Sequence, residues 1–209
     1  MYRRNFSLMF FSFLLAGCAA SETRSLVSRD DLPASKYKKI AVFIENLDAA
    51  ERPVAEKIVV SALQNAGVSA ASGAEIFGGR GTSLSEKAKA SIVQNEFDAV
   101  VYLTVVEKGI VEERIPNAFF DGQMVQYNFG FVTVGHNLTA NYIIKPDGSV
   151  YQPMLALKTK VDMQDTKSAK EVWTSETIST GSAQITNMPT LFTQASDQIV
   201  TKMREDSAI

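Results

Sequence analysis

Cysteine and histidine are almost absent from this 209-residue chain, which has one of each, Cys18 and His136. An internal disulfide needs two thiols and zinc sites usually draw on several Cys or His ligands, so the sequence predicts neither. A Ser-His-Asp triad needs a serine beside its histidine, and the Gly-x-Ser-x-Gly elbow that would supply it is missing. We therefore expect no catalytic residue, no cofactor and no metal, and His136 at the surface or at a strand end.

The chain also has no excess of positive charge. Its 21 Lys and Arg residues stand against 23 Asp and Glu residues, which gives a formal net charge of −2. There is no basic run of the kind on which non-specific nucleic-acid binding depends. The composition therefore argues against a nucleic-acid partner.

Long apolar runs are missing too, apart from a short one at the N-terminus. Residues 6–15 are mostly apolar, follow two arginines and precede small residues. A transmembrane helix needs about 20 apolar residues, whereas this order is typical of a secretory signal peptide. The sequence predicts a signal peptide at residues 1–17, cleaved between Gly17 and Cys18. The arginine pair leaves both general and twin-arginine export open.

The end of this segment, Leu15-Ala16-Gly17-Cys18, resembles the lipobox of bacterial lipoproteins. In that family the cysteine thiol receives diacylglycerol, and the amine freed by cleavage is acylated, with palmitate for example. The resemblance implies that Cys18 is the lipidated residue, which would explain a lone thiol in an exported chain. The alternative is a plain export signal with an incidental cysteine. Three acyl chains would hold permanently, because each buried methylene contributes roughly 0.8 kcal/mol.

Residues 18–36 are small, polar or charged and include Pro33. This composition favours a flexible tether, which could reach about 60 Å at ~3.4 Å per residue. Residues 37–209 have the length of one domain with a sizeable core. Loss of the two signal-peptide arginines leaves the mature chain with a net charge of about −4.

Hydrophobic periodicity predicts two helices and three strands in the first half of this domain. A strand at 39–45 is followed by a helix between Asp48, which can cap it, and Gly67, which can close it. Its predicted buried stripe is Val54, Ile58, Val59 and Leu63. A weak strand at 68–72, a helix after a capping box at Ser83 and Glu86, and a central strand at 99–106 complete this half.

The second half predicts strands, turns and a last helix. Alternating residues favour strands at 125–131, 136–144, 154–163 and 171–178, with a turn at 146–148. Pro189 suits the start of a helix that carries Leu191, Ala195, Ile199 and Met203 at helical spacing. The fold class is therefore α+β: a single domain with a βαβαβ start, then antiparallel strands and a C-terminal helix, with helices packed on a mixed sheet.

Several segments together resemble a family of periplasmic lipoproteins. They are Tyr37-Lys-Lys-Ile-Ala-Val-Phe, Phe97-Asp98-Ala99-Val100-Val101-Tyr102, the turn Asp165-Thr166-Lys167, and Val172-Trp173-Thr174-Ser175. The domain looks like those related to the curli secretion channel subunit and to the lipoprotein activator of penicillin-binding proteins. The turn here is longer and has Lys167 in place of Gly, and Thr174-Ser175 replaces Ser-Gly. The resemblance implies a similar fold, with Trp173 in the core.

The segment 118–135 is the main candidate for an interaction surface. It is longer than a strand connection requires and rich in aromatic residues. It is interpreted as an ordinary strand with its loop, as an exposed apolar surface for a partner, or as a membrane-inserting hairpin like that of the curli channel. Its candidate contact residues are Phe119, Phe120, Val125, Tyr127, Phe129 and Phe131.

Two other patterns carry weaker hypotheses. Glycines at 78, 79 and 81 before a helix are compatible with an anion site, but a phosphate-loop motif is missing. Asp162, Asp165 and Glu171 flank one turn and suggest a weak calcium site, although their spacing is not that of an EF-hand. A plain loop and solvated turn charges are the favoured interpretations.

These features predict a non-enzymatic, lipid-anchored envelope protein whose domain binds a periplasmic protein in envelope assembly or maintenance. The alternative is a subunit of an oligomeric outer-membrane secretion channel of the curli type. Ala19 follows the cysteine in place of the Asp that retains enterobacterial lipoproteins in the inner membrane. That resemblance favours the outer membrane, with the domain facing the periplasm.

Overall fold

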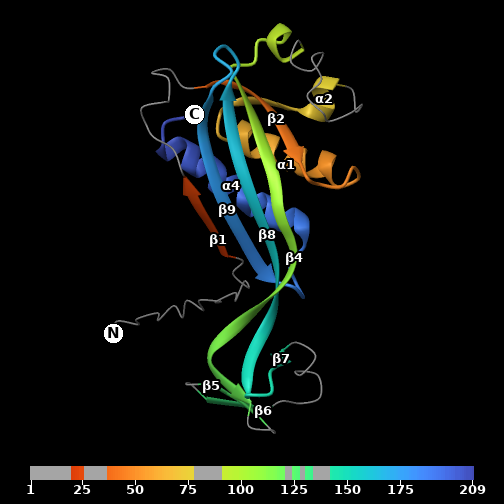
Figure 1. The fold of residues 1–209 in the computed structure, drawn as a ribbon, viewed down its shortest axis with the longest axis vertical. Coiled ribbons are helices and arrows are strands. Elements are labelled where there is room, and N and C mark those ends of the chain that lie inside the picture. Colours follow the sequence, from red (N-terminus) through yellow and green to blue (C-terminus); the bar gives the residue numbers. More distant parts are fainter. Residues whose placement is uncertain (1–19, 26–36, 78–90, 121–123, 128–129, 134–141) are drawn as a thin grey trace, which may run out of the picture.

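The structure, a computed structural model, describes residues 20–25, 37–77, 91–120, 124–127, 130–133 and 142–209 (Figure 1). Six strands follow one another across a sheet in the order β1-β9-β8-β4-β2-β3. Their bounds are β1 Ala20–Ser25, β2 Lys39–Glu45, β3 Ser69–Ser72, β4 Ala99–Phe120, β8 Ser149–Asp165 and β9 Glu171–Ser182. Three short strands extend the same sheet: β5 Met124–Tyr127, β6 Gly130–Thr133 and β7 Ile143–Ile144.

The sheet is mixed, as the sequence predicts. β2 pairs in parallel with β3 and with β4. In the chain, α1 (Arg52–Asn65) lies between β2 and β3, and α2 (Gly73–Phe77) and a helical segment at 91–94 lie between β3 and β4. β4, β8, β9 and β1 pair antiparallel. The predicted βαβαβ start, the antiparallel continuation and the C-terminal helix α4 (Met188–Glu205) are confirmed, so the α+β class is too.

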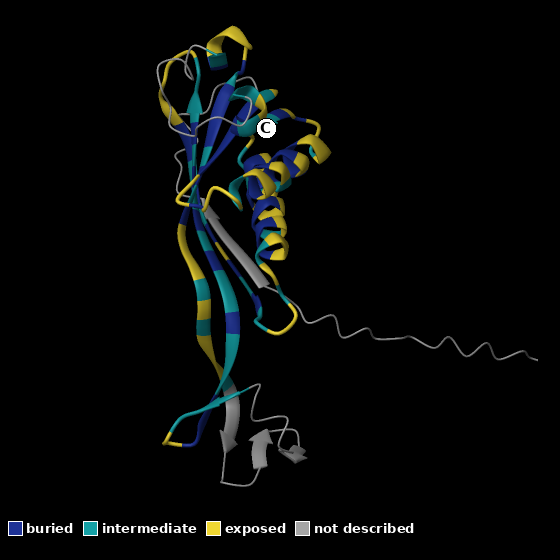
Figure 2. Ribbon diagram, turned by 90° about the vertical axis from the view of Figure 1, so that its right-hand side faces the viewer, coloured by how far each residue is buried: buried dark blue, intermediate teal, exposed yellow. Residues whose placement is uncertain are grey.

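Helices α1 and α4 lie together on one face of the sheet (Figure 2). The predicted stripe of α4 is buried to the last residue, because helical spacing places all four side chains on the side of the strands. Val59 and Leu63 of α1 are also buried, but Val54 is 52 % exposed. Val54 was expected in the stripe; it lies instead at the outer seam between the two helices.

Small side chains of β9 let α4 lie close to the sheet. Ser175, Thr177 and Ser179 are fully buried and alternate with half-buried or exposed residues of the other face. Gly181 continues this row, and a Cβ there would lie 2.4 Å from the Thr186 hydroxyl oxygen. The return from β9 to α4 therefore requires glycine at this position.

The helix ends differ from the sequence prediction in one respect. The Asp48 side chain does not cap α1; it accepts a hydrogen bond from Lys108, and the helix begins at Arg52. Gly67 does follow the helix with φ +85°, and Asn187 caps α4 by accepting a bond from the Thr190 N–H. The Asp48 carboxylate, which the local sequence predicted as a helix cap, thus forms an ion pair with a residue far away in the chain.

Strand lengths also differ from the prediction. β4 runs for 22 residues, well past the strand that was expected at 99–106, and contains Glu112 and Glu113. The expected single strand at 125–131 is two strands, β5 and β6, which pair antiparallel. Of the expected strand at 136–144, residues 143–144 form β7 and the rest lies outside the described residues.

The region expected to be a flexible tether contains a strand. β1 lies within residues 18–36 and pairs with β9 over six residues, from Ala20 opposite Thr180 to Ser25 opposite Ser175. Polar composition alone favours a linker, but an open sheet edge supplies backbone partners that composition does not report. The prediction of a tether along the whole of 18–36 is therefore wrong for residues 20–25.

Trp173 is the anchor of the helix-covered core. It is fully buried, and its indole N–H donates to the Asp206 carboxylate at 3.0 Å, just past the end of α4.

Trp173→Phe removes this bond and leaves space, so we expect a loss of about 2–3 kcal/mol in the free energy of unfolding, measured with urea. Ile178→Thr, on the same strand but 48 % exposed, should change it by less than about 0.5 kcal/mol. Equal losses for the two variants would contradict this role of Trp173.

Candidate functional site

Strands β4 and β8 extend beyond the rest of the sheet as an arm (Figure 1). β2 pairs with β4 no further than Thr104, and β9 pairs with β8 no further than Met154. From Glu112 opposite Pro153 onward, β4 and β8 pair with each other without either neighbour. We call this part, with β5, β6 and β7, the arm.

The tip of the arm holds the aromatic segment predicted as an interaction surface. Phe119 and Phe120 end β4, opposite Gln126 and Val125 of β5. In β6, Phe131 lies opposite Gln126, and the chain places Tyr127 at the end of β5. Five of the six candidate residues therefore belong to adjacent strands, while Phe129 lies outside the described residues.

A two-stranded ribbon is marginally stable by itself, and two sets of side-chain contacts beside β7 brace this one. Lys145 forms an ion pair with Glu112 at 2.5 Å, and its ammonium lies 5.3 Å from the centre of the Tyr151 ring. The predicted turn at 146–148 is confirmed: Gly148 has φ +81°, and Asp147 accepts bonds from the N–H and hydroxyl of Ser149. These contacts hold β7 against β8.

The residues that carry the family resemblance meet at the opposite end of the sheet. The Asp98 carboxylate accepts bonds from the N–H groups of Lys38 and Lys39, at 3.0 and 2.9 Å. Thr166, in the turn between β8 and β9, donates its N–H to the Asp98 carbonyl and its hydroxyl to the Phe97 carbonyl. These motifs therefore join three strand ends to one turn.

Asp165 is the centre of this polar end cluster. It accepts bonds from the Tyr37 hydroxyl at 3.2 Å and from the N–H groups of Lys167 and Ser168. Burial by itself raises the pKa of Asp165, but bonds from Ser168, Tyr37 and Lys167 outweigh it, so the pKa lies below its ordinary value. Burial and the Asp165 charge both raise the pKa of Tyr37. The carboxylate is thus fully engaged in holding the turn.

The carboxylates of the weaker calcium hypothesis do not gather into one cluster. Asp162 accepts bonds from Lys160 and Thr174, and the Asp165 side chain is occupied as above. Among the residues that the structure describes, no group of three His, Cys, Asp or Glu residues comes close enough to hold a metal ion. Gly17, Cys18, His136 and the glycines at 78, 79 and 81 lie outside the described residues.

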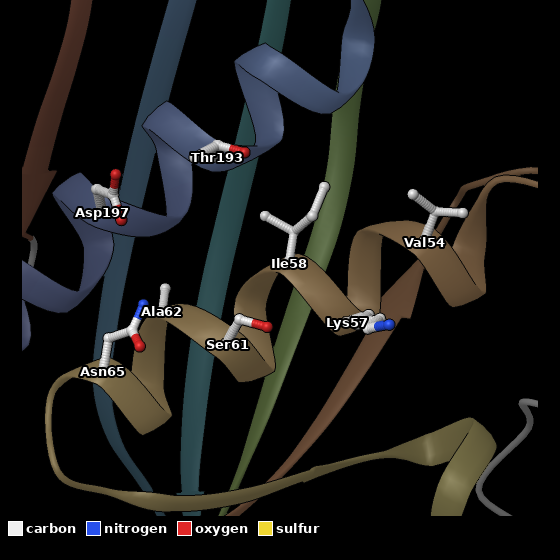
Figure 3. Close-up of a pocket in the computed structure, with 8 residues that line it drawn as sticks. All are labelled: Val54, Lys57, Ile58, Ser61, Ala62, Asn65, Thr193 and Asp197. Carbon is white, nitrogen blue, oxygen red and sulfur yellow. The ribbon is translucent and has the colours of Figure 1, made fainter.

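A groove between α1 and α4 was not predicted from the sequence. One part, of about 290 Å³, is lined by Val54, Lys57, Ile58, Ser61, Ala62, Asn65, Thr193 and Asp197 (Figure 3). A second part, of about 250 Å³, shares Val54 and Ile58 and continues to Met188 and Phe192 at the start of α4. The floor is apolar, and the charged residues of its rim are Lys57 and Asp197 in the first part and Glu51 in the second. Val54, which the sequence predicted to be buried, is exposed because it lines this groove.

Glu56 lies on the buried side of α1 and is 1 % exposed. Its carboxylate accepts a bond from the Ala74 N–H at 3.1 Å, which holds the start of α2 against α1. Burial raises the pKa of Glu56, against the hydrogen bonds from the backbone, which lower it. The spacing of apolar residues did not predict the burial of Glu56, because a single Glu at a buried helix position adds no periodic signal to the sequence.

No helix in the described part of the chain is long and apolar enough to span a bilayer.

Comparison with known proteins reveals a likeness at the level of structure. No protein-family model matches the chain, and no curated protein matches it in sequence. The fold resembles that of PelC. A PelC dodecamer from Paraburkholderia phytofirmans aligns with a TM-score of 0.50 over 92 % of this chain and 100 % of that one, at 13 % identity. At this identity the likeness to PelC concerns the fold alone.

A second solved structure is lipoprotein GNA1162 from Neisseria meningitidis. It aligns over 80 % of this chain and 99 % of its own, with 15 % identity and a TM-score of 0.41. The likeness to PelC concerns the fold, and the resemblance to the curli-channel and penicillin-binding-protein-activator lipoproteins stays a prediction.

The raised pKa of Glu56 predicts a defined pH dependence. A group whose pKa is raised on folding stabilises the fold when protonated, and this contribution is lost as the pH rises through the folded-state pKa. Glu56→Gln keeps an acceptor for the Ala74 N–H and cannot ionise. We therefore expect the stability of the variant, relative to the original protein, to increase from pH 4 to pH 8 in urea unfolding curves. Glu171→Gln, at an exposed position, is the control and should show no such trend.

Proposed function

We propose that the mature protein is a non-enzymatic lipoprotein, anchored through N-acyl and S-diacylglycerol groups on Cys18 in the outer membrane and facing the periplasm. Its domain binds a protein partner in envelope assembly or maintenance. The observation that carries this proposal is a lipobox, Leu15-Ala16-Gly17-Cys18, followed directly by a domain with the fold of PelC. Residues 1–17 are the signal peptide in this proposal, and 37–209 the main body of the domain.

The use of the polar side chains supports a binding role. Asp98, Asp165 and Thr166 bond to the backbone and to Tyr37, and so hold strand ends in place. The hollows beside them are lined by these three residues, by Phe97 and Tyr102, and by the exposed Glu96 and Lys167. A general acid or base needs a titratable group free to exchange a proton with a substrate, and Asp98 and Asp165 are committed to structure.

The groove between α1 and α4 is the surface we assign to the protein partner. It is apolar, lies on two rigid helices, and exposes Val54 where the periodicity of α1 would bury it. Protein interfaces place apolar side chains in such hollows and surround them with polar groups. Lys57 and Asp197 supply that polar rim.

The second candidate function is a subunit of an oligomeric secretion channel. One observation favours it: the PelC structures that share this fold are dodecamers. In this alternative the partner in the groove is another copy of the chain.

Lipidation at Cys18 gives the first prediction of this proposal. The original protein, expressed in a bacterium with lipoprotein-processing enzymes, should incorporate labelled palmitate and fractionate with membranes. Cys18→Ser should incorporate none and keep its signal peptide, since the acceptor thiol is gone. Intact mass spectrometry measures both. Unchanged labelling of Cys18→Ser would rule out this anchor.

The groove gives the second prediction of this proposal. A photoreactive amino acid at Ser61, an exposed residue of the groove, should yield a discrete crosslinked product in intact cells. Val54→Glu should reduce its yield about tenfold, because it places a charge on the apolar floor at a cost near 1.4 kcal/mol in binding. Val93→Glu, also at an exposed valine but outside the groove, is the matched control.

The mass of the product separates the two candidate functions. A product with a second protein supports the first, and a ladder at multiples of the chain's own mass supports the channel subunit. Light scattering on the mature chain without Cys18 gives an independent answer: a monomer contradicts the channel, and a ring contradicts a simple anchored domain. Absence of any crosslink at Ser61 contradicts the assignment of the groove.

A further inference from the structure

The direction of β1 determines where the N-terminal end of the domain lies. β1 is antiparallel to β9, so Ala20 pairs with Thr180, near the end of β9, and Ser25 pairs with Ser175. Thr180 lies opposite Ala156 of β8, which in turn lies opposite Gly109 of β4. These rows lie immediately before the arm begins at Glu112, and Figure 1 shows β1 starting at that end of the sheet.

The chain between this strand and the lipobox cysteine is very short. Cys18 is two residues before Ala20. Two fully extended residues span at most about 7 Å. A lipid on Cys18 is therefore held at the arm end of the sheet for as long as β1 stays paired, in place of the ~60 Å reach of a free tether.

The strands of the arm tip have a composition suited to a lipid surface. None of their described residues is charged: this holds for 115–120 at the end of β4 and for β5, β6 and β7. In the whole chain 21 % of residues are charged. The turn that leads into β8 lies beside these strands, because Ser149 is opposite Phe119, and it carries Lys145 and the exposed Asp147. Uncharged aromatic strands with charged side chains beside them are the arrangement of protein segments that lie in the membrane interface, where such side chains reach the headgroups.

From these observations we infer that β1 clamps the lipid anchor to the edge of β9, so that the arm faces the bilayer that holds the anchor and its tip enters that bilayer's surface. This inference rests on the proposed lipidation of Cys18. The tip is too short to cross the bilayer, because β4 offers six uncharged residues after Arg114 and a spanning strand needs about 9–11. The contact is therefore with one leaflet, and the α1–α4 groove stays in water for a protein partner.

Engineered thiols can test this orientation, because lipidation consumes the only native cysteine. Gln126→Cys places a fluorophore in β5 at the tip, and Lys167→Cys places one in the exposed turn at the opposite end of the sheet. The lipidated proteins are reconstituted in vesicles of phosphatidylethanolamine and phosphatidylglycerol with nitroxide-labelled acyl chains. We expect quenching at position 126 to be at least about threefold stronger than at position 167, since the quencher is confined to the bilayer.

The clamp is tested by removing its backbone donors. Glu22→Pro with Thr23→Pro removes two adjacent N–H groups, so one that faces β9 is lost whichever residue it belongs to. This pair should abolish the difference between positions 126 and 167. Val27→Pro with Ser28→Pro is the matched control beyond the strand and should preserve it. Independently, Val125→Lys in the tip should reduce quenching at position 126 while β1 is intact.

Each outcome has one interpretation. Equal quenching at the two positions in the original protein overturns the orientation, and a difference that survives Glu22→Pro with Thr23→Pro overturns the clamp. Quenching at position 126 that is blocked by an added partner protein, or that appears when copies assemble without vesicles, assigns the tip to protein instead of lipid. An unacylated Cys18 with no vesicle binding overturns the proposed anchor and this inference together, whereas an acylated Cys18 with equal quenching overturns this inference alone.

Discussion

The antiparallel pairing of β4 with β8 is the constraint on which the rest of the molecule depends. It runs from Ala99 opposite Asp165 to Phe119 opposite Ser149, with a bulge at Val106. β2 and β3 attach to one side of this ribbon and β9 and β1 to the other, and α1 and α4 cover one face where all these strands are present. Beyond that point the ribbon continues without neighbours and becomes the arm. A single long pairing thus builds both the core of the domain and its projecting part.

The two ends of this ribbon have opposite chemistry. At one end, backbone groups and the side chains of Asp98, Asp165 and Thr166 satisfy each other and hold the turn between β8 and β9. Buried or half-buried polar groups that are fully paired rigidify a fold, and they leave little capacity for a ligand. At the other end the described residues of the strands beyond Arg114 carry no charge, Lys145 and Asp147 lie in the turn beside them, and two strands have no helix layer over them. The first end explains how the turn between β8 and β9 is held, and the second leaves two strands without a covering layer.

The groove and the arm are separated in space. The groove between α1 and α4 lies on the helix-covered face, whereas the arm and the first residue of β1 lie at one end of the sheet. An anchor on Cys18, as proposed above, would leave the groove accessible to a partner in the surrounding solvent. In the alternative proposal, a channel subunit, the partner in this groove is another copy of the chain.

The sequence by itself determined the α+β class, the order of its elements, the stripe of α4 and the burial of Trp173, because these depend on local periodicity and on side chains with few alternatives. It also located the aromatic segment and the lipobox-like Leu15-Ala16-Gly17-Cys18, since both are contiguous in the chain. It missed β1, the α1–α4 groove and the engagement of Asp48 by Lys108. These depend on partners far away in the chain: a vacant sheet edge, a second helix, and a lysine 60 residues further on. Only the tertiary structure brings such partners together, because backbone pairing and ion pairing across the fold leave no period in the sequence.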